Sequence, residues 1–339
     1  MKNTVYRLIK PRNIEAQDEQ ITIKDGEVLV RPKYLAICAA DQRYYLGKRN
    51  KADLEKKLPL ALIHESWGEI ESSSNSGFSK GDKVFMIPNI PTEQDAEIEE
   101  NYLRSSKFHG SSLDGFMQQH VVMNSDRVVK FVNIDKTVAA IAEMISVAIH
   151  AISTFKESVE QKSGTIGVWG DGNLGFLTCL MLKELLPTFK VTVFGIDQQK
   201  LDQFTFVDEV INANNIPEEY TVDFAFECVG GKVTEEVIDQ IIETINPEGT
   251  ITLMGVSEKS VLINTRMILE KGLNIIGRSR SGRAAFVLVA EILDGNTGIQ
   301  EEIKKIIKKT LTIHNVNDMI NAFEYDAVSS NKTVMKWEI

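Results

Sequence analysis

The residues of this chain whose types could hold a metal ion are a cysteine, a histidine–glutamate pair and a distant glutamate. Cys38, His64, Glu65 and Glu143 stand in that order along the sequence. Thiolate, imidazole and carboxylate are zinc ligands, and a catalytic zinc keeps three protein ligands and an open position. A lone buried cysteine is usually a small hydrophobic residue, but the set indicates an open site that polarises a carbonyl or alcohol oxygen.

A glycine loop supplies the second chemical signal. Gly170, Gly172 and Gly175 follow an apolar run at 165–169 and open a helical pattern at 174–186. The first glycine permits a tight turn, the second lets the backbone approach a pyrophosphate, and the third lets the helix pack on the strand. The helix N-terminus attracts the anion. The loop therefore predicts dinucleotide binding, and the alternative is another doubly wound protein such as a methyltransferase.

The residue at the end of the next strand bears on which dinucleotide binds. An NAD site usually places an acidic residue there, about 20 residues beyond the loop, to bind the ribose 2′-hydroxyl. Here the position is Gly195, which would leave room for a 2′-phosphate that Lys200 could neutralise. In the competing interpretation Asp197 binds the ribose of NAD. We predict NADP(H).

The elements that must position these residues follow two different sequence patterns, one in each part of the chain. The first 150 residues contain short strands with turns, such as 28–32 and 81–87, whereas strands and helices alternate from about Gly164. Strand-like runs at 165–169, 190–194, 222–227, 249–254 and 273–276 alternate with helical patterns at 174–186, from 198, and at 233–245. This alternation predicts a parallel sheet with right-handed crossovers. We expect the tail, with a late strand at 332–337, to return to the first domain, giving a β-rich domain at 1–150 and 281–339 around an α/β domain at 151–280.

Composition excludes several classes of function. The chain has 339 residues and a net charge of −10, which argues against general binding to nucleic acid or an anionic membrane. No apolar run approaches the roughly 20 residues that span a bilayer, and the first residues lack the apolar segment of a secretory signal. The three cysteines cannot form a disulfide framework. We expect a cytoplasmic protein.

Longer strings carry a family resemblance. They are Cys38-x-x-Asp41, Pro59 to Gly68 (with His-Glu-x-x-Gly), Gly81 to Val84, the glycine loop, Glu227 to Gly230, and Pro247 to Gly249 before Gly255. Together they resemble the zinc-dependent medium-chain alcohol and polyol dehydrogenases. Within that family, the stretches 37–45, 169–175 and 278–282 resemble bacterial ribulose-5-phosphate reductases.

The resemblance implies a fold, an activity and a site. The fold would join a β-rich GroES-like catalytic domain to a Rossmann-type domain. The activity would be NADPH-dependent reduction of D-ribulose 5-phosphate to D-ribitol 5-phosphate, which supplies CDP-ribitol for cell-envelope polymers such as teichoic acid. A homodimer and functional partnership with a ribitol-5-phosphate cytidylyltransferase are implied as well. Zinc would be held by Cys38, His64 and Glu143, with Glu65 as a supporting or exchanging ligand. The cofactor would be bound by Gly170, Gly172, Asn173, Leu174, Gly175, Gly195, Lys200, Val229 and Gly255.

Three departures from the family pattern alter these expectations. The stretch 89–113 lacks the four cysteines of a structural zinc, so we expect one catalytic zinc only. Ala40 replaces the hydroxyl residue that relays a proton, which leaves Glu65, Tyr44 or water for that step. Ile63 replaces the glycine that usually precedes His-Glu, which would change how the pair is presented.

A pentulose phosphate also requires cationic donors, for which arginine is well suited. Arg43 and Lys48 are the preferred positions, and the further candidates are Arg49, Arg104, Lys107, Arg278 and Arg280. The acidic run 93–100 is predicted to be a solvated helix face. Two rival functions remain open: a dehydrogenase of an unphosphorylated polyol such as sorbitol or xylitol, and a catalytically silent dinucleotide-binding protein.

Overall fold

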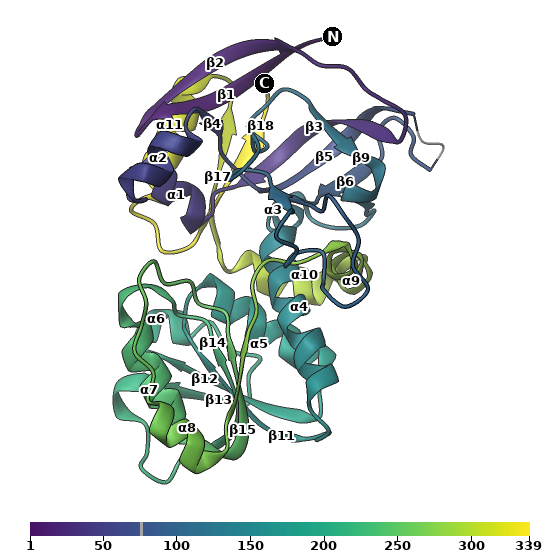
Figure 1. Cartoon of the computed structure of the whole chain (residues 1–339). Helices are drawn as coiled ribbons and strands as arrows, with labels where there is room; N and C mark the ends of the chain where they lie inside the picture. The colour runs from purple at the N-terminus through teal and green to yellow at the C-terminus, as the bar shows by residue number, and fades with distance from the viewer. Residues whose placement is uncertain (75–76) are drawn as a thin grey trace. The chain divides into compact units, whose positions relative to one another are not determined.

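A computed structural model describes residues 1–74 and 77–339. The chain forms two compact units, one made of residues 1–146 and 280–339 and the other of residues 147–279 (Figure 1). In the part of the chain that the structure describes, no helix is long and apolar enough to cross a membrane.

The first unit is built around a mixed sheet. Its strand order is β10-β6-β5-β3-β18-β17, with β9 also paired to β3. These strands are β3 (Glu27–Ala36), β5 (Glu65–Ser73), β6 (Lys83–Met86), β9 (Val121–Asn124), β10 (Val128–Lys130), β17 (Ile307–Ile313) and β18 (Lys332–Trp337). The central strand β3 pairs antiparallel with both β5 and β18. The tail of the chain thus enters the same sheet as the strand that begins at Glu65.

A smaller sheet and several helices complete this unit. The small sheet has the order β2-β1-β4, and β7 pairs with β8. The strands are β1 (Lys2–Lys10), β2 (Asn13–Gln20), β4 (Leu60–Ala61), β7 (Asn89–Ile90) and β8 (Lys107–Phe108). The helices are α1 (Ala39–Tyr45), α2 (Lys51–Lys57), α3 (Lys136–Ala140), α9 (Arg283–Leu293), α10 (Thr297–Lys304) and α11 (Val316–Asp326), together with the start of α4 (Ala142–Ser158).

The second unit is a parallel sheet of the doubly wound type (teal to green in Figure 1). Its order is β13-β12-β11-β14-β15-β16, and every adjacent pair is parallel. The strands are β11 (Gly164–Trp169), β12 (Phe189–Gly195), β13 (Glu209–Asn212), β14 (Val222–Glu227), β15 (Ile245–Leu253) and β16 (Asn274–Gly277), and the helices are α5 (Asn173–Leu185), α6 (Gln198–Leu201), α7 (Thr234–Thr244) and α8 (Thr265–Lys271). The predicted fold class is confirmed. The strand order reverses between β11 and β14, where open α/β sheets bind ligands.

The acidic run 93–100 was the clearest error of the secondary-structure prediction. It forms bends rather than a helix. Asp95 accepts hydrogen bonds from the backbone amides of Glu97 and Ile98, each at 2.8 Å, and such local bonds compete with helix formation. Like charges one helical turn apart also repel. Glu100 instead forms an ion pair of 2.9 Å with the buried Arg127.

Candidate active site

Three of the predicted metal ligands come together in the first unit. Cys38 caps the N-terminus of α1, and His64 and Glu65 lie at the start of β5. One ligand atom from each residue can be chosen so that all three lie within 4.8 Å of one another. The Glu65 carboxylate is fully buried, and its Oε2 atom has no hydrogen-bond partner. A buried carboxylate oxygen without a partner is costly, so a cation at this point fits the donor set, which is typical of zinc.

Asp41 joins the two segments that carry these ligands. Its Oδ2 atom accepts a hydrogen bond from the Cys38 backbone amide at 3.1 Å. Its Oδ1 atom accepts one from the Ile63 amide at 3.0 Å and lies 3.4 Å from His64 Nδ1. Burial alone would lower the pKa of His64, but the charges of Asp41 and Cys38 outweigh it and raise that pKa. A carboxylate in this position orients the imidazole of a metal ligand. Sequence reasoning assigned Asp41 no role, although the Cys-x-x-Asp spacing contained the signal.

The backbone immediately before His64 adopts a conformation that explains the glycine of the family pattern. Ile63 has a φ of 73°, in the left-handed region, and its side chain is fully buried. A β-branched residue is a genuine outlier there, and such strain persists only where the surroundings fix it. Ile63 therefore holds, with strain, a backbone conformation that glycine adopts without it.

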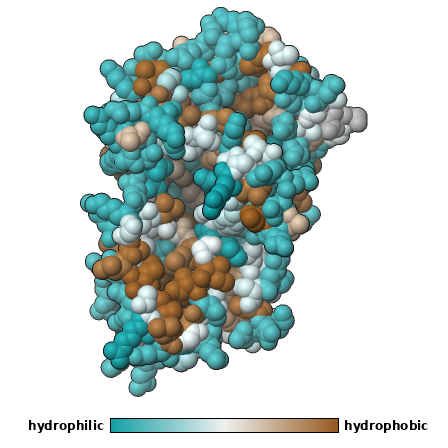
Figure 2. Space-filling view, viewed as in Figure 1, coloured by the Kyte–Doolittle hydropathy of each residue, from teal (hydrophilic) through white to brown (hydrophobic). Residues whose placement is uncertain are grey.

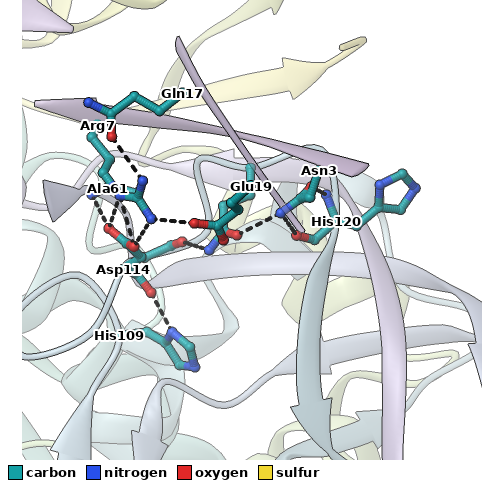
Figure 3. Close-up of polar contacts among 10 residues, drawn as sticks. Asn3, Arg7, Gln17, Glu19, Ala61, His109, Asp114 and His120 are labelled. Carbon is teal, nitrogen blue, oxygen red and sulfur yellow. Dashed lines mark hydrogen bonds and ion pairs between the residues drawn. The ribbon is translucent and has the colours of Figure 1, made fainter. Parts of the chain in front are cut away.

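A polar network, part of which Figure 3 shows, holds the strained turn at Ile63 in place. The Ile63 carbonyl accepts a hydrogen bond from the Phe116 amide at 2.7 Å. The Asp114 carboxylate accepts from the Ala61 amide at 2.8 Å and pairs with Arg7 at 2.6 Å. At Gly115 a Cβ atom would lie 2.3 Å from the Ile63 carbonyl oxygen, so no side chain fits there. Strand β1, through Arg7, thus helps to hold the segment that presents His64.

Lys332 is a buried charge at the same site that sequence reasoning missed. Its ammonium lies 2.6 Å from Glu65 Oε1 and donates to the Ile37 carbonyl at 3.1 Å. The two side chains are 3% and 0% exposed, which makes this a fully buried ion pair. Burial would lower the pKa of Lys332, but the negative charges of Glu65 and Cys38 raise it. A single lysine in a strand pattern gave no signal of this role.

Glu143 lies near the group of three without being part of it. It is buried in the first turn of α4, and burial raises its pKa to about 7. The charge of His64 lowers that pKa and the charge of Glu65 raises it, so the three groups interact electrostatically. The structure therefore brings Cys38, His64 and Glu65 together, with Glu143 beside them.

The predicted proton donor and phosphate residues lie on or near α1. Tyr44 is buried, and its hydroxyl accepts a hydrogen bond from Lys57 at 2.9 Å. Arg43 is half-buried in the last turn of α1, whereas Lys48 is exposed in the turn that follows. Neither of these two belongs to the metal-ligating group.

In the second unit the glycine loop has the geometry of a pyrophosphate cradle. Gly170 has a φ of 132°, which favours glycine. A Cβ atom on Gly175 would lie 1.9 Å from the Gly170 carbonyl oxygen, so the close packing of helix on strand requires glycine. A Cβ atom on Gly172 would meet nothing within 4 Å, which leaves the backbone open to a ligand at the N-terminus of α5.

A pocket of about 260 Å³ lies beside this loop at the carboxyl ends of β11 and β12. Its lining is largely apolar and includes Trp169, Phe194, Ile196, Val229 and Val233. Figure 2 shows apolar surface gathered over this unit, and Ile196 is 67% exposed. An apolar slot with a few polar groups at its rim suits a planar ring such as adenine.

The structure gives a different reason for glycine at position 195. The Cβ atom of Asp171 occupies the adjoining space, 2.6 Å from where a Cβ of Gly195 would stand. The Asp171 carboxylate accepts hydrogen bonds from the amides of Ile196 and Asp197 at 2.8 and 2.9 Å. Lys200 lies 3.9 Å from the carboxylates of both Asp171 and Asp197. A side chain at position 195 would therefore collide with Asp171, and Lys200 brings a cation to this edge.

Glu227 organises the loops that follow β14 and β15. Its buried carboxylate accepts hydrogen bonds from the amides of Val229 and Gly230, each at 2.8 Å, and of Gly255 at 2.9 Å. A Cβ atom on Gly255 would lie 2.4 Å from that carboxylate. Two of the predicted cofactor residues, Val229 and Gly255, are therefore held by one side chain to which sequence reasoning gave no role.

Comparisons with known proteins identify the family of this chain. The alcohol dehydrogenase GroES-like domain family matches residues 24–133. Over the full length of both chains, the sequence is 46% identical to ribulose-5-phosphate reductase 2 of Staphylococcus aureus and 45% identical to ribulose-5-phosphate reductase of Bacillus spizizenii. The crystal structure of S. aureus TarJ in complex with NADPH matches all of both chains, with a TM-score of 0.89 at 41% identity. The chain therefore belongs to the ribulose-5-phosphate reductases, within the zinc-dependent medium-chain dehydrogenases.

Proposed function

We propose that this chain reduces D-ribulose 5-phosphate to D-ribitol 5-phosphate with NADPH. The observation that carries the proposal is the group formed by Cys38, His64 and Glu65, whose ligand atoms lie within 4.8 Å of one another. The full-length similarity to ribulose-5-phosphate reductases supports the choice of substrate, and the likeness to TarJ in complex with NADPH supports the choice of cofactor.

Cys38 and His64 are two of the proposed zinc ligands, and a carboxylate is the third. Glu143 was the expected third ligand, with Glu65 exchanging; the distances support Glu65 in that place and Glu143 as its neighbour. A zinc ion held there supplies Lewis-acid polarisation of the substrate ketone. The residues around it fix its ligands: Asp41 orients His64, and Lys332 holds one oxygen of Glu65.

In the second unit, the glycine loop and the N-terminus of α5 would bind the pyrophosphate of NADPH. The pocket lined by Trp169 and Val229 would hold the adenine, and Lys200 would neutralise the 2′-phosphate. The proposed cofactor residues are those predicted from the sequence: Gly170, Gly172, Asn173, Leu174, Gly175, Gly195, Lys200, Val229 and Gly255. The nicotinamide supplies the hydride.

The proton that completes the alcohol comes from the protein or from water. Ala40 has no hydroxyl, and Glu65 is occupied as the third zinc ligand and by Lys332 at 2.6 Å. Tyr44, beside Lys57 at 2.9 Å, and bound water are therefore the proposed donors. Replacing Tyr44 by Phe removes the hydroxyl and keeps the ring, so a loss in kcat would assign the donor to Tyr44.

We also propose that the enzyme acts in the cytoplasm as a homodimer. Its product would be the precursor of CDP-ribitol for teichoic acid. A ribitol-5-phosphate cytidylyltransferase would consume its product. The similarity to ribulose-5-phosphate reductases supports the reaction from which this placement is inferred.

The test is NADPH oxidation with D-ribulose 5-phosphate, before and after chelation of zinc. We expect turnover that chelation abolishes and that zinc restores. Cys38→Ser should lose turnover and bound zinc while retaining NADPH binding, whereas Cys179→Ala, which alters a buried thiol of the second unit, should retain both. Full activity in zinc-free Cys38→Ser would contradict the zinc mechanism, and NADPH oxidation only with unphosphorylated ketoses would contradict the substrate.

A further inference from the structure

We propose that Lys57, Ser111 and Arg280 form the subsite that binds the 5-phosphate of the substrate, beside His64. The inference rests on the proposed function and names the residues that select a phosphorylated sugar.

The first observation is a half-buried ammonium whose described partners are all neutral. Lys57, at the end of α2, donates to the Tyr44 hydroxyl at 2.9 Å and to Ser111 Oγ at 3.1 Å. Among the residues that the structure describes, no carboxylate lies within ion-pair distance of Lys57. A cation held by neutral oxygens has its charge uncompensated, and an anion is the ligand that such a place attracts.

The second observation is where this ammonium lies. Tyr44 is on α1, the helix whose N-terminus Cys38 caps. Ser111 follows Gly110, where a Cβ atom would lie 3.6 Å from the His64 Cβ. Lys57 is therefore bonded to neighbours of both metal-ligating segments. A pentulose phosphate extends roughly 6 Å from its carbonyl carbon to phosphorus at about 1.5 Å per bond, which is compatible with a ketone at the metal ligands and a phosphate at Lys57.

Arg280 brings a second cation to the loop that carries Ser111, whose backbone amide donates to the Phe108 carbonyl at 3.2 Å. Its guanidinium carbon lies 4.9 Å from the centroid of the Phe108 ring, and that ring lies 5.5 Å from the imidazole of His64. Arg280 is exposed and has a φ of 58°, so its backbone is strained. Strain of this kind gathers at functional sites. The Arg280 guanidinium thus lies over Phe108, the ring beside the proposed metal ligand His64.

Arg49 adds rigidity to this subsite. Its guanidinium lies 4.8 Å from the centroid of the Tyr44 ring, and the Lys57 ammonium lies 5.6 Å from the same ring. These contacts fix the tyrosine that holds Lys57 in place. On a chain with a net charge of −10, such a concentration of cations beside the metal ligands suits an anionic substrate.

The experiment compares D-ribulose 5-phosphate with unphosphorylated D-ribulose in zinc-loaded enzyme. Lys57→Met and Arg280→Met should each lower kcat/KM for the phosphorylated substrate by roughly 10- to 100-fold, the factor of one charge-assisted hydrogen bond. The loss on D-ribulose should be smaller in each variant, because the unphosphorylated sugar has no phosphate to contact these cations. Lys56→Met is the matched control, because Lys56 is the exposed neighbour on α2, and it should change neither activity. Arg43→Met tests the earlier phosphate assignment in the same assay.

The outcomes separate the alternatives. An equal loss on both substrates would show that Lys57 is structural and would overturn the proposal. So would a preference for D-ribulose 5-phosphate over D-ribulose that is unchanged in both Lys57→Met and Arg280→Met. A preference lost only in Arg43→Met would overturn it as well. If the wild type failed to reduce D-ribulose 5-phosphate at all, the proposed function would fall, and calorimetry with inorganic phosphate would still decide the subsite. Binding to the wild type but not to Lys57→Met would support it, and absent or equal binding would refute it.

Discussion

Replacing Ile63 should reveal how much strain the turn before His64 stores. The side chain is fully buried, so Ile63→Ala should lower the free energy of unfolding by about 2–5 kcal/mol. The φ of 73° costs a residue with a Cβ atom roughly 1–2 kcal/mol, and glycine escapes that cost. Glycine normally loses about 0.5–1 kcal/mol relative to alanine through backbone entropy, and about 0.8 kcal/mol more for the missing methyl group. At position 63 these terms nearly cancel, so Ile63→Gly should be as stable as Ile63→Ala.

The assay is equilibrium unfolding in urea at a fixed zinc concentration, with Ile70 as the matched control. Ile70 is 1% exposed in β5 and has no positive φ. There the glycine variant should be less stable than the alanine variant by about 1–2 kcal/mol. The difference between the two sites measures the strain. A glycine variant at 63 that is less stable than its alanine variant by the same margin as at 70 would refute the reasoning.

Three further predictions address the cofactor loops, the network of Figure 3 and acid stability. Glu227→Gln places an amide group among three backbone N–H donors, so fluorescence titration should show NADPH binding weakened by roughly 10-fold or more; an unchanged Kd would contradict this role. Arg7→Met removes the main partner of Asp114 and should cost about 1.5–3 kcal/mol of unfolding free energy, whereas Arg266→Met, from an exposed helical pair, should cost under about 0.5 kcal/mol. Burial lowers the pKa of His109, so the unfolded chain binds a proton first as the pH falls below about 6.5. The stability of the wild type relative to His109→Gln should therefore be constant above about pH 7 and fall by up to about 1.4 kcal/mol per pH unit below 6.5, until the folded pKa is reached; a pH-independent difference would contradict it.

Local signals predicted much of the second unit. The helix predicted at 174–186 is α5 to within one residue, and the strand predicted at 222–227 is β14. Both lie in buried parallel-sheet architecture, where continuous apolar runs and glycine turns are strong signals. The strand β17 was missed because its exposed lysines and threonines give no apolar pattern, and it is stabilised by pairing with β18.

The amino-acid sequence contains the groups that carry the chemistry of this protein. Zinc and dinucleotide chemistry follow from the donor atoms of a cysteine and a His-Glu pair and from the backbone freedom of a glycine loop. How those groups are supported depends on the folded chain. Asp41 bridges two segments, and Lys332 reaches Glu65 from the far end of the chain. Contacts of that kind depend on which distant strands become neighbours in the folded sheet, and no local spacing encodes them.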